Sequence, residues 1–333
     1  MIKLVQLQHP QEGRKVARVM DNELCLLKDC SSIYALALAA IEGSKSIESL
    51  VADGLIESYL EYNPIYNGDS KWKLLPSFDH PQDSLKCMLS GTGLTHKASA
   101  ENRQAMHDKA DEELTDSMKM YQLGVKGGQP TEGSIGVQPE WFYKGNGSQL
   151  RGHLDKLEVP SYAMDGGEEP EIAGVYVCDA NGKPFRIGFT TANEFSDHIM
   201  EKQNYLYLAP SKIRHCAIGP ELVVGAAFED LSGKVAVYRD GKEVWSQNIK
   251  SGESNMAHNL RNLEYHHFKY DNHCQPELAH VHFFGADAFS FGVQIALKDG
   301  DQMVVNWQGF GRSLINFISI SSESETSVDV GVL

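Results

Sequence analysis

The amino-acid sequence predicts an α+β fold in which strands outnumber helices. Short apolar runs separated by turn residues occupy residues 4–27 and are typical of strands. From about residue 171 onward, most apolar segments again have the length and spacing of strands. Helical spacing occurs only in separate segments that do not alternate regularly with strands. A doubly wound parallel sheet is therefore not expected.

The first 80 residues are predicted to form a small N-terminal domain. Strands over residues 4–8, 16–20 and 24–27 are followed by a helix over residues 33–42 that ends at Gly43. Apolar residues then recur at helical spacing and predict a second helix over residues 46–62. The proline-bounded segment at residues 79–81 marks the predicted boundary, so residues 81–333 form the second domain.

The second domain combines a few helices with many strands. Asn181-Gly182 and Asp240-Gly241 are dipeptides that favour tight hairpin turns. The expected strands are residues 87–94, 172–178, 185–189, 222–228, 235–239, 244–249, 281–284, 289–297 and 303–307, and the expected helices are residues 98–109, 115–123 and 255–268.

Composition excludes several classes of function. The chain has 30 Lys and Arg against 45 Asp and Glu, a formal net charge of −15. Such a surface repels phosphate backbones, so no nucleic-acid partner is expected. The longest apolar candidate, residues 33–41, is half the ~18 residues that a membrane helix needs. The N-terminus lacks the apolar region of a secretory signal, so we expect a cytoplasmic protein with reduced cysteines.

An acidic cluster at residues 165–171 leads directly into an apolar strand. Glu169 and Glu171 are two residues apart, and in an extended chain they point to one face. Carboxylates held together repel each other unless a cation lies between them, and oxygen ligands suit Mg²⁺, Mn²⁺ or Ca²⁺. The alternative is a solvated acidic turn before the strand.

Glu194 is the candidate third ligand. The hairpin around Asn181-Gly182 returns the chain antiparallel, which brings Glu194 near the strand that carries Glu171. Three carboxylates on one side of a metal leave the other side open to water or a bidentate ligand. The alternative is a helix N-terminus capped by Asn193, and both interpretations are compatible.

Two lysines and several histidines are further candidates. Lys212 would be a fixed charge for a substrate carboxylate or a developing enolate. Lys144 follows an aromatic run at residues 141–143, and its alternative role is a lysine whose stem packs on the aromatic rings. His96, with Glu101 on the following helix, is a candidate general base, although a lone histidine can also be structural.

Six of the thirteen histidines lie between His258 and His282. His280 and His282 would share one face of a strand, and Cys274 is near in sequence, so a zinc site is one interpretation. No third and fourth ligand follow at a recognisable spacing. Buried, hydrogen-bonded histidines are the preferred interpretation.

Taken in order, these segments resemble the fumarylacetoacetate hydrolase superfamily. The resemblance covers about residues 74–316 and rests on the order of its short motifs. The matching motifs are the aromatic stretch of residues 139–144, Glu169-Pro170-Glu171, Asn193-Glu194-Phe195-Ser196, Lys212 before Gly219-Pro220, and Gly300-Asp301 before Gly311 and Asn316.

The resemblance implies a mixed β-roll or β-sandwich catalytic domain behind a small N-terminal domain. It also implies a homodimer, and a divalent cation held by Glu169, Glu171 and Glu194. Glu194 replaces the usual aspartate, and His198 and Glu201 stand where arginine and glutamine are usual. Substrate contacts are therefore altered while the metal site is retained. The pattern is most similar to the branch associated with bacterial sugar-acid breakdown.

These features lead to an expected activity, hydrolytic C–C cleavage of a small 2,4-diketo acid to give pyruvate. The metal would chelate the 1-carboxylate and the 2-keto oxygen, and Lys144 would contact the substrate. Water activated by His96 and Glu101 would attack the C4 carbonyl, and the metal and Lys212 would stabilise the enolate.

Three alternatives remain open. The same metal site would support a 2-keto-3-deoxy-sugar-acid dehydratase, because a substrate without a C4 ketone gives water nothing to attack. Oxaloacetate decarboxylation is a further variant. A catalytically silent sugar-acid binding protein is the alternative outside enzymes.

Overall fold

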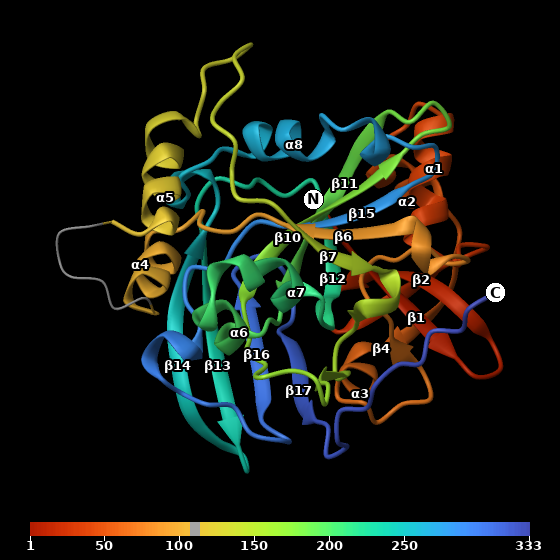
Figure 1. The fold of residues 1–333 in the computed structure, drawn as a ribbon. Coiled ribbons are helices and arrows are strands. Elements are labelled where there is room, and N and C mark those ends of the chain that lie inside the picture. Colours follow the sequence, from red (N-terminus) through yellow and green to blue (C-terminus); the bar gives the residue numbers. More distant parts are fainter. Residues whose placement is uncertain (107–113) are drawn as a thin grey trace.

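The computed structural model describes residues 1–106 and 114–333, and within these residues it contains two β-sheets (Figure 1). The larger sheet has twelve strands, and its main path runs from β4 (Ile56–Glu61) through β3 (Glu23–Leu27), β2 (Gly13–Met20), β1 (Ile2–His9), β12 (Cys216–Val224), β11 (Pro184–Asn193), β10 (Pro170–Cys178), β15 (Ala279–Phe283) and β6 (Cys87–Gly91) to β7 (Phe142–Asn146). Two short strands lie off this path: β5 (Lys73–Leu74) pairs with β1, and β8 (Leu150–Arg151) pairs with β12.

The smaller sheet has five strands, in the order β14 (Lys242–Ser251), β13 (Leu231–Arg239), β16 (Gln302–Trp307), β17 (Leu314–Ile320) and β9 (Lys156–Val159). The helices are α1 (Ile33–Glu42), α2 (Ile47–Asp53), α3 (Tyr62–Tyr66), α4 (Lys97–Met106), α5 (Asp116–Gly127), α6 (His198–Gln203), α7 (Leu208–Lys212) and α8 (Leu260–Phe268). The predicted α+β class is therefore confirmed.

The N-terminal strands belong to the same sheet as the strands of the second half. Strand β1 pairs antiparallel with β12, with Lys3 opposite Val223, so the sheet is continuous across the two halves of the chain. The domain boundary near residue 80 stays a prediction.

Both predicted hairpin turns are present. Strands β10 and β11 pair antiparallel around Asn181-Gly182, and β13 and β14 pair around Asp240-Gly241. Gly182 has a φ of +81°, and a Cβ there would lie 2.1 Å from the carbonyl oxygen of Cys274. Only glycine fits this turn without strain.

Two predicted elements are wrong, and so is the interpretation of Asn193 as a helix cap. Helix α2 ends at Asp53, and residues 56–61 form strand β4 instead of continuing the helix, because Gly54 interrupts it and β3 offers a pairing edge. The expected strand over residues 289–297 is a short 3-10 helix, Ser290–Val293. Asn193 ends strand β11, and Asp197 caps helix α6, so Asn193 is not a helix cap. Lys109, the expected end of α4, lies outside the described residues.

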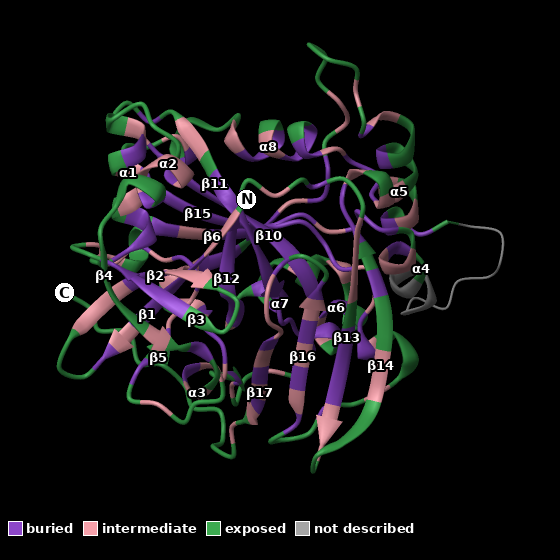
Figure 2. Ribbon diagram, turned by 180° about the vertical axis from the view of Figure 1, so that it is seen from behind, coloured by how far each residue is buried: buried purple, intermediate pink, exposed green. Residues whose placement is uncertain are grey.

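The centre of the larger sheet is buried on both faces. All nine residues of β10 and all nine of β12 are buried. On one face Ala173 and Val175 pack in a cluster with Ile33 of α1, and on the other Ile172 packs in a cluster with Trp307 of the smaller sheet. Figure 2 shows this buried centre between exposed margins. Each fully buried aliphatic side chain contributes about 1.5–3 kcal/mol, so the central strands form a rigid base for what they carry.

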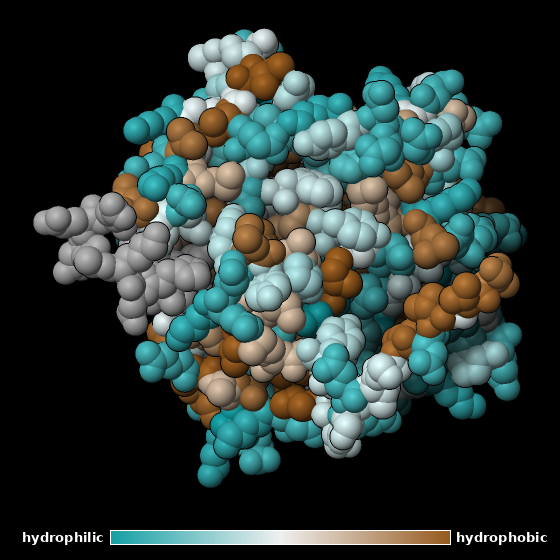
Figure 3. All heavy atoms as spheres, in the orientation of Figure 1, coloured by the Kyte–Doolittle hydropathy of each residue, from teal (hydrophilic) through white to brown (hydrophobic). Residues whose placement is uncertain are grey.

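The C-terminal segment beyond residue 321 forms no helix or strand. Val328, Val330, Val332 and Leu333 are all more than 80% exposed. Figure 3 shows a row of hydrophobic residues on the surface close to the C-terminus marked in Figure 1. Among the described residues, no helix has the length and apolar character needed to cross a membrane.

The predicted histidine-rich region is a buried hydrogen-bonded cluster. The two ring nitrogens of His282 each lie 2.8 Å from a hydroxyl, those of Ser90 and Thr92. His267 Nε2 lies 3.1 Å from His280 Nδ1. Among the described residues, no set of zinc-ligand atoms converges in this region, so the structure does not support the zinc interpretation. Burial, with smaller effects from neighbouring histidines, lowers the pKa of His280 and of His282 to about 3.

These low pKa values predict acid sensitivity. A histidine titrates near ~6.5 in the unfolded chain, so the unfolded state takes up protons below this pH while the folded state does not. The stability contributed by each histidine is complete above pH 6.5 and is lost as the pH falls, by about 1.4 kcal/mol per pH unit. Urea unfolding at pH 7.5 and pH 5.0 should show this loss, and His282→Gln should reduce it. Equal pH dependence in the variant and the wild type would contradict the prediction.

Candidate metal centre

The β10–β11 hairpin brings three glutamates together. Pro170 lies opposite Asn193, and the backbone N–H of Glu194 donates to the carbonyl of Glu169 at 2.9 Å. Glu169, Glu171 and Glu194 each offer a carboxylate oxygen, and these atoms all lie within 4.8 Å of one another. All three residues are buried. The predicted convergence of the three carboxylates is therefore confirmed.

Burial makes this arrangement electrostatically costly. The pKa of Glu171 is raised well above its usual value by burial and then by the charges of Glu194 and Glu169. Burial and Glu169 raise the pKa of Glu194 to about 8, although Lys144 and Lys212 oppose the shift. Carboxylates in such a site remain charged only with a cation among them. The cluster therefore favours a bound cation.

A backbone amide orients Glu171. The N–H of Gly285 donates to Glu171 Oε2 at 2.7 Å. Gly285 has a φ of +97°, and a Cβ there would lie 2.1 Å from Thr95 Oγ1, so the position requires glycine. Gly285 was not predicted as a functional residue.

Two buried lysines hold the other two carboxylates. Lys212 Nζ donates to Glu169 Oε1 at 2.8 Å and to Glu194 Oε2 at 2.7 Å. Burial opposes ionisation of Glu169, but Lys212, a hydrogen bond with Glu194 and His198 outweigh it and hold the pKa of Glu169 well below its usual value. Lys144 Nζ lies 2.7 Å from Glu194 Oε1 and also donates to the carbonyl of Phe195. Lys144 therefore sits behind a candidate ligand, and its contact with substrate stays a prediction.

Helix α6 supplies two further side chains, His198 and Glu201. His198 Nε2 lies 2.9 Å from Glu169 Oε1, and its ring stacks on Phe289 at 4.8 Å between centroids. Glu201 Oε1 accepts from Ser211 Oγ at 2.9 Å and lies 3.3 Å from Lys212 Nζ. The sequence marked both residues only as departures from the resembling family. Their spacing of three on a helix places them on one face.

The structure does not bring the predicted His96–Glu101 pair together. His96 is buried, its Nδ1 lies 3.0 Å from Thr95 Oγ1, and burial lowers its pKa to about 4. The Glu101 carboxylate is half exposed and pairs with Lys97 at 3.1 Å. His96 is also absent from the described lining of the cavity at the glutamates. The role of His96 as a base stays a prediction that this geometry does not support.

A small enclosed cavity of about 10 Å³ adjoins the glutamates. Its described lining consists of Gly93, Ser99, Phe142, Glu169, Glu171, His198, Glu201, Lys212, Gly285, Ala286 and Phe289. This volume is about one water-sized sphere. The donor set is made only of carboxylate oxygens, which suits a hard cation such as Mg²⁺. The residues present therefore fit a divalent metal ion.

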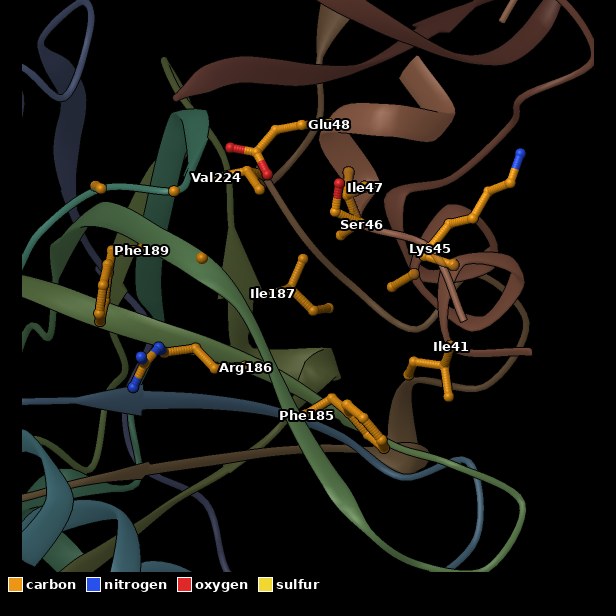
Figure 4. Close-up of a pocket in the computed structure, with 15 residues that line it drawn as sticks. Ile41, Lys45, Ser46, Ile47, Glu48, Phe185, Arg186, Ile187, Phe189 and Val224 are labelled. Carbon is orange, nitrogen blue, oxygen red and sulfur yellow. The ribbon is translucent and has the colours of Figure 1, made fainter. Parts of the chain in front are cut away.

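A larger cavity of about 330 Å³ lies elsewhere, between helices α1–α2 and strands β11–β12 (Figure 4). Ile41, Ile47 and Ile187 contribute to its apolar lining. Figure 4 shows Lys45 extending away from the cavity and Arg186 turned toward Phe189. Its lining includes none of the three glutamates, so it is separate from the metal centre.

Comparison with known proteins gives the fold and one partial sequence relative. No protein-family model matches the chain. A 2-dehydro-3-deoxy-D-arabinonate dehydratase from Saccharolobus solfataricus is 30% identical over 122 residues, which cover 35% of this chain and 40% of that protein.

The solved structures match over nearly the whole chain. A 2-keto-3-deoxy-D-arabinonate dehydratase complexed with magnesium and 2,5-dioxopentanoate has a TM-score of 0.71 at 18% identity, covering 96% of this chain and 100% of that one. A 2-hydroxyhepta-2,4-diene-1,7-dioate isomerase from Mycobacterium marinum has a TM-score of 0.58 at 13% identity, with coverages of 97% and 100%.

The chain therefore has the fumarylacetoacetate hydrolase-like fold, and the resemblance predicted from its motifs is confirmed. Within this fold, the three buried glutamates form a group that could hold a metal ion. The expected hydrolytic C–C cleavage is wrong, because the sequence relative and the solved structures with TM-scores of 0.69–0.71 are dehydratases. The substrate in the names of these dehydratases, a 2-keto-3-deoxy sugar acid, has no carbonyl at C4. The water of the expected hydrolysis would therefore have no C4 carbonyl to attack.

The triad predicts a specific response to Mg²⁺. Glu171→Gln keeps an acceptor for Gly285 N–H but removes one buried charge. We expect Mg²⁺ to raise the melting temperature of the wild type. At a Mg²⁺ concentration of 100 times the dissociation constant, the free energy of unfolding should increase by about 2.7 kcal/mol. The variant should lose most of this increase. Without metal, the variant should be at least as stable as the wild type. Differential scanning calorimetry measures both effects.

The neighbouring Glu168 provides the matched control for this prediction. It is equally buried, but its oxygens accept from the N–H and Oγ of Ser290 and not from the triad. Glu168→Gln should retain the Mg²⁺-induced increase. An unchanged increase in Glu171→Gln would contradict the assignment of Glu171 as a ligand.

Proposed function

We propose that the protein is a magnesium-dependent dehydratase of 2-keto-3-deoxy sugar acids, with 2-keto-3-deoxyarabinonate as its substrate. The observation that carries the proposal is the buried glutamate triad in the fold of a dehydratase solved with magnesium and 2,5-dioxopentanoate. The partial sequence relative has the same activity in its name. The likeness to these dehydratases, at TM-scores of 0.69–0.71, exceeds the likeness to the isomerase at 0.58.

The reaction removes one molecule of water from the sugar acid. A proton leaves C3, which is acidic because it adjoins the C2 ketone, and hydroxide leaves C4. The resulting double bond between C3 and C4 then shifts to C4–C5, and the enol so formed becomes the C5 aldehyde of 2,5-dioxopentanoate. Negative charge develops on the C2 oxygen when the C3 proton leaves, so a catalyst must stabilise an enolate.

The chain's own residues fit this requirement. Glu169, Glu171 and Glu194 would hold Mg²⁺, which when bound supplies a Lewis acid for the keto-acid end of the substrate. Lys212 lines the cavity, and its Nζ donates to both carboxylate oxygens of Glu169 and to one of Glu194, which places its charge beside the developing negative charge. Lys144 and His198 orient Glu194 and Glu169 through direct hydrogen bonds or ion pairs. The homodimer and the cytoplasmic location stay predictions.

The assay distinguishes the proposed reaction from the alternatives by its product. Purified protein with Mg²⁺ and 2-keto-3-deoxyarabinonate should form 2,5-dioxopentanoate, detected as an aldehyde, and no pyruvate. Chelation of the metal should abolish the reaction, and Mg²⁺ should restore it. Aldehyde formation that is insensitive to chelator, or pyruvate as the product, would contradict the proposed function.

Lys212→Met tests the proposed electrostatic role. Removing one stabiliser of the developing charge should lower kcat by about 10²–10³. Lys234→Met is the matched control, because Lys234 is a half-exposed lysine paired with Glu243 on the smaller sheet. The control should retain wild-type kcat. A Lys212→Met variant with wild-type kcat would remove Lys212 from the mechanism.

A further inference from the structure

One segment of the chain, residues 197–214, connects β11 to β12 and carries two side chains of the metal centre. Asn193 at the end of β11 lies opposite Ala217 of β12, so the chain leaves and re-enters the sheet at neighbouring positions. Helices α6 and α7 lie between them, joined by a 3-10 turn. His198 is the first residue of α6, and Lys212 is the last residue of α7. We call residues 197–214 the α6–α7 segment.

The two side chains meet at one carboxylate oxygen. His198 Nε2 lies 2.9 Å from Glu169 Oε1, and Lys212 Nζ donates to the same oxygen at 2.8 Å. Partners of this kind orient a metal-binding carboxylate only while they keep their own positions. The geometry of Glu169 therefore depends on where the sheet holds both ends of the α6–α7 segment.

The outer part of the α6–α7 segment is exposed to solvent. Leu206 in the 3-10 turn is 82% exposed, and the neighbouring Tyr207 is 46% exposed. Parts of a fold with few buried contacts open most easily. The position of the segment is therefore set mainly at its buried ends.

A buried ion pair joins these two ends. Asp197 directly precedes α6, and Arg214 follows α7 by two residues. Arg214 Nη2 donates to Asp197 Oδ2 at 3.1 Å, and both residues are buried. Removing one partner of a buried ion pair is costly, because the other charge is left without compensation. The pair therefore closes the base of the α6–α7 segment.

Asp197 also attaches this base to the surrounding chain. Its Oδ1 accepts from the N–H of Met200 at 2.9 Å and so caps α6. Its Oδ2 accepts from the N–H of Met164 at 2.8 Å, immediately before the acidic cluster. The N–H of Asp197 donates to the carbonyl of Ser211 in α7 at 3.2 Å. One buried carboxylate thus connects the start of α6, the end of α7 and the chain that leads to Glu169.

We propose that Asp197 and Arg214 are positioning residues that hold His198 and Lys212 at Glu169. They act by closing the base of the α6–α7 segment, and neither is among the described residues that line the cavity at the glutamates. The expected effect on catalysis rests on the proposed function. The position of the segment, in contrast, can be measured without substrate.

Arg214→Met tests the effect on catalysis, because it removes the ion pair but keeps an apolar side chain in place of the arginine stem. With Mg²⁺ and 2-keto-3-deoxyarabinonate, kcat should fall by at least about tenfold. KM should change little, because Lys212 acts on charge that develops only in the transition state. Arg214→Lys keeps the charge beside Asp197 and should retain most of kcat.

A double variant separates positioning from charge. Arg214→Met leaves the Asp197 carboxylate uncompensated near the metal centre, and Asp197→Asn combined with Arg214→Met removes this charge as well. We expect the double variant to remain as slow as Arg214→Met. Recovery of wild-type kcat in the double variant, or a loss in Arg214→Lys as large as in Arg214→Met, would overturn the proposal.

Amide hydrogen exchange of the full chain measures the position of the α6–α7 segment directly. In Arg214→Met, amides of residues 198–212 should exchange at least about tenfold faster than in the wild type. Arg214→Gln provides the same measurement if Arg214→Met does not fold. Unchanged exchange over these residues would overturn the proposal.

The matched control is another arginine–aspartate pair, on the smaller sheet. Arg239 donates to both carboxylate oxygens of the buried Asp301, at 2.8 and 2.7 Å. Arg239→Met should leave both kcat and the exchange of residues 198–212 at their wild-type values. Equal effects of Arg239→Met and Arg214→Met would show a general loss of stability and overturn the positioning role.

Failure of this proposal is distinguishable from failure of the proposed function. A wild type that does not dehydrate 2-keto-3-deoxyarabinonate, with faster exchange over residues 198–212 in Arg214→Met, would overturn the dehydratase assignment alone. A wild type that dehydrates this substrate, with wild-type kcat in Arg214→Met, would overturn the role of the ion pair alone.

Discussion

The repulsion among three buried carboxylates is the constraint on which the rest of the site depends. Glu169, Glu171 and Glu194 have oxygens within 4.8 Å of one another in a region that excludes water. Two charges at such a distance interact several times more strongly inside a protein than in water. The fold tolerates this arrangement because two lysines hold two of the carboxylates and a backbone amide holds the third.

The central strands supply the rigidity that this constraint requires. Strand β10 is buried along its whole length between β11 and β15, so its side chains have little freedom to separate. The backbone around the ligands is fixed in the same way. Trp307 Nε1 donates to the carbonyl of Glu171 at 2.9 Å, and Glu169 N–H donates to Asn193 Oδ1 at 3.2 Å. Charged groups thus remain close together because neutral contacts on every side prevent them from moving apart.

Adjacent glutamates in one short segment have different roles. Glu169 and Glu171 turn toward the triad, whereas Glu168 binds Ser290 and so fixes the loop that carries Phe289. Phe289 in turn packs on His198, which binds Glu169. The acidic cluster therefore both forms the site and holds the loop that covers it. This arrangement explains why residues 289–297 are not a strand: Glu168 binds the backbone N–H of Ser290, which a sheet partner would otherwise use.

Local sequence determined the hairpin and the carboxylate pair. Asn181-Gly182 sets the turn, and the two-residue spacing of Glu169 and Glu171 sets their common face, because both depend only on backbone geometry within a few residues. Tertiary structure decided which cations face which acids, since the partners of Lys144 and Lys212 come from segments far apart in sequence. It also separated His96 from Glu101 and turned residues 56–61 into a strand. These outcomes depend on burial and on the pairing edge of β3, which the sequence does not display locally.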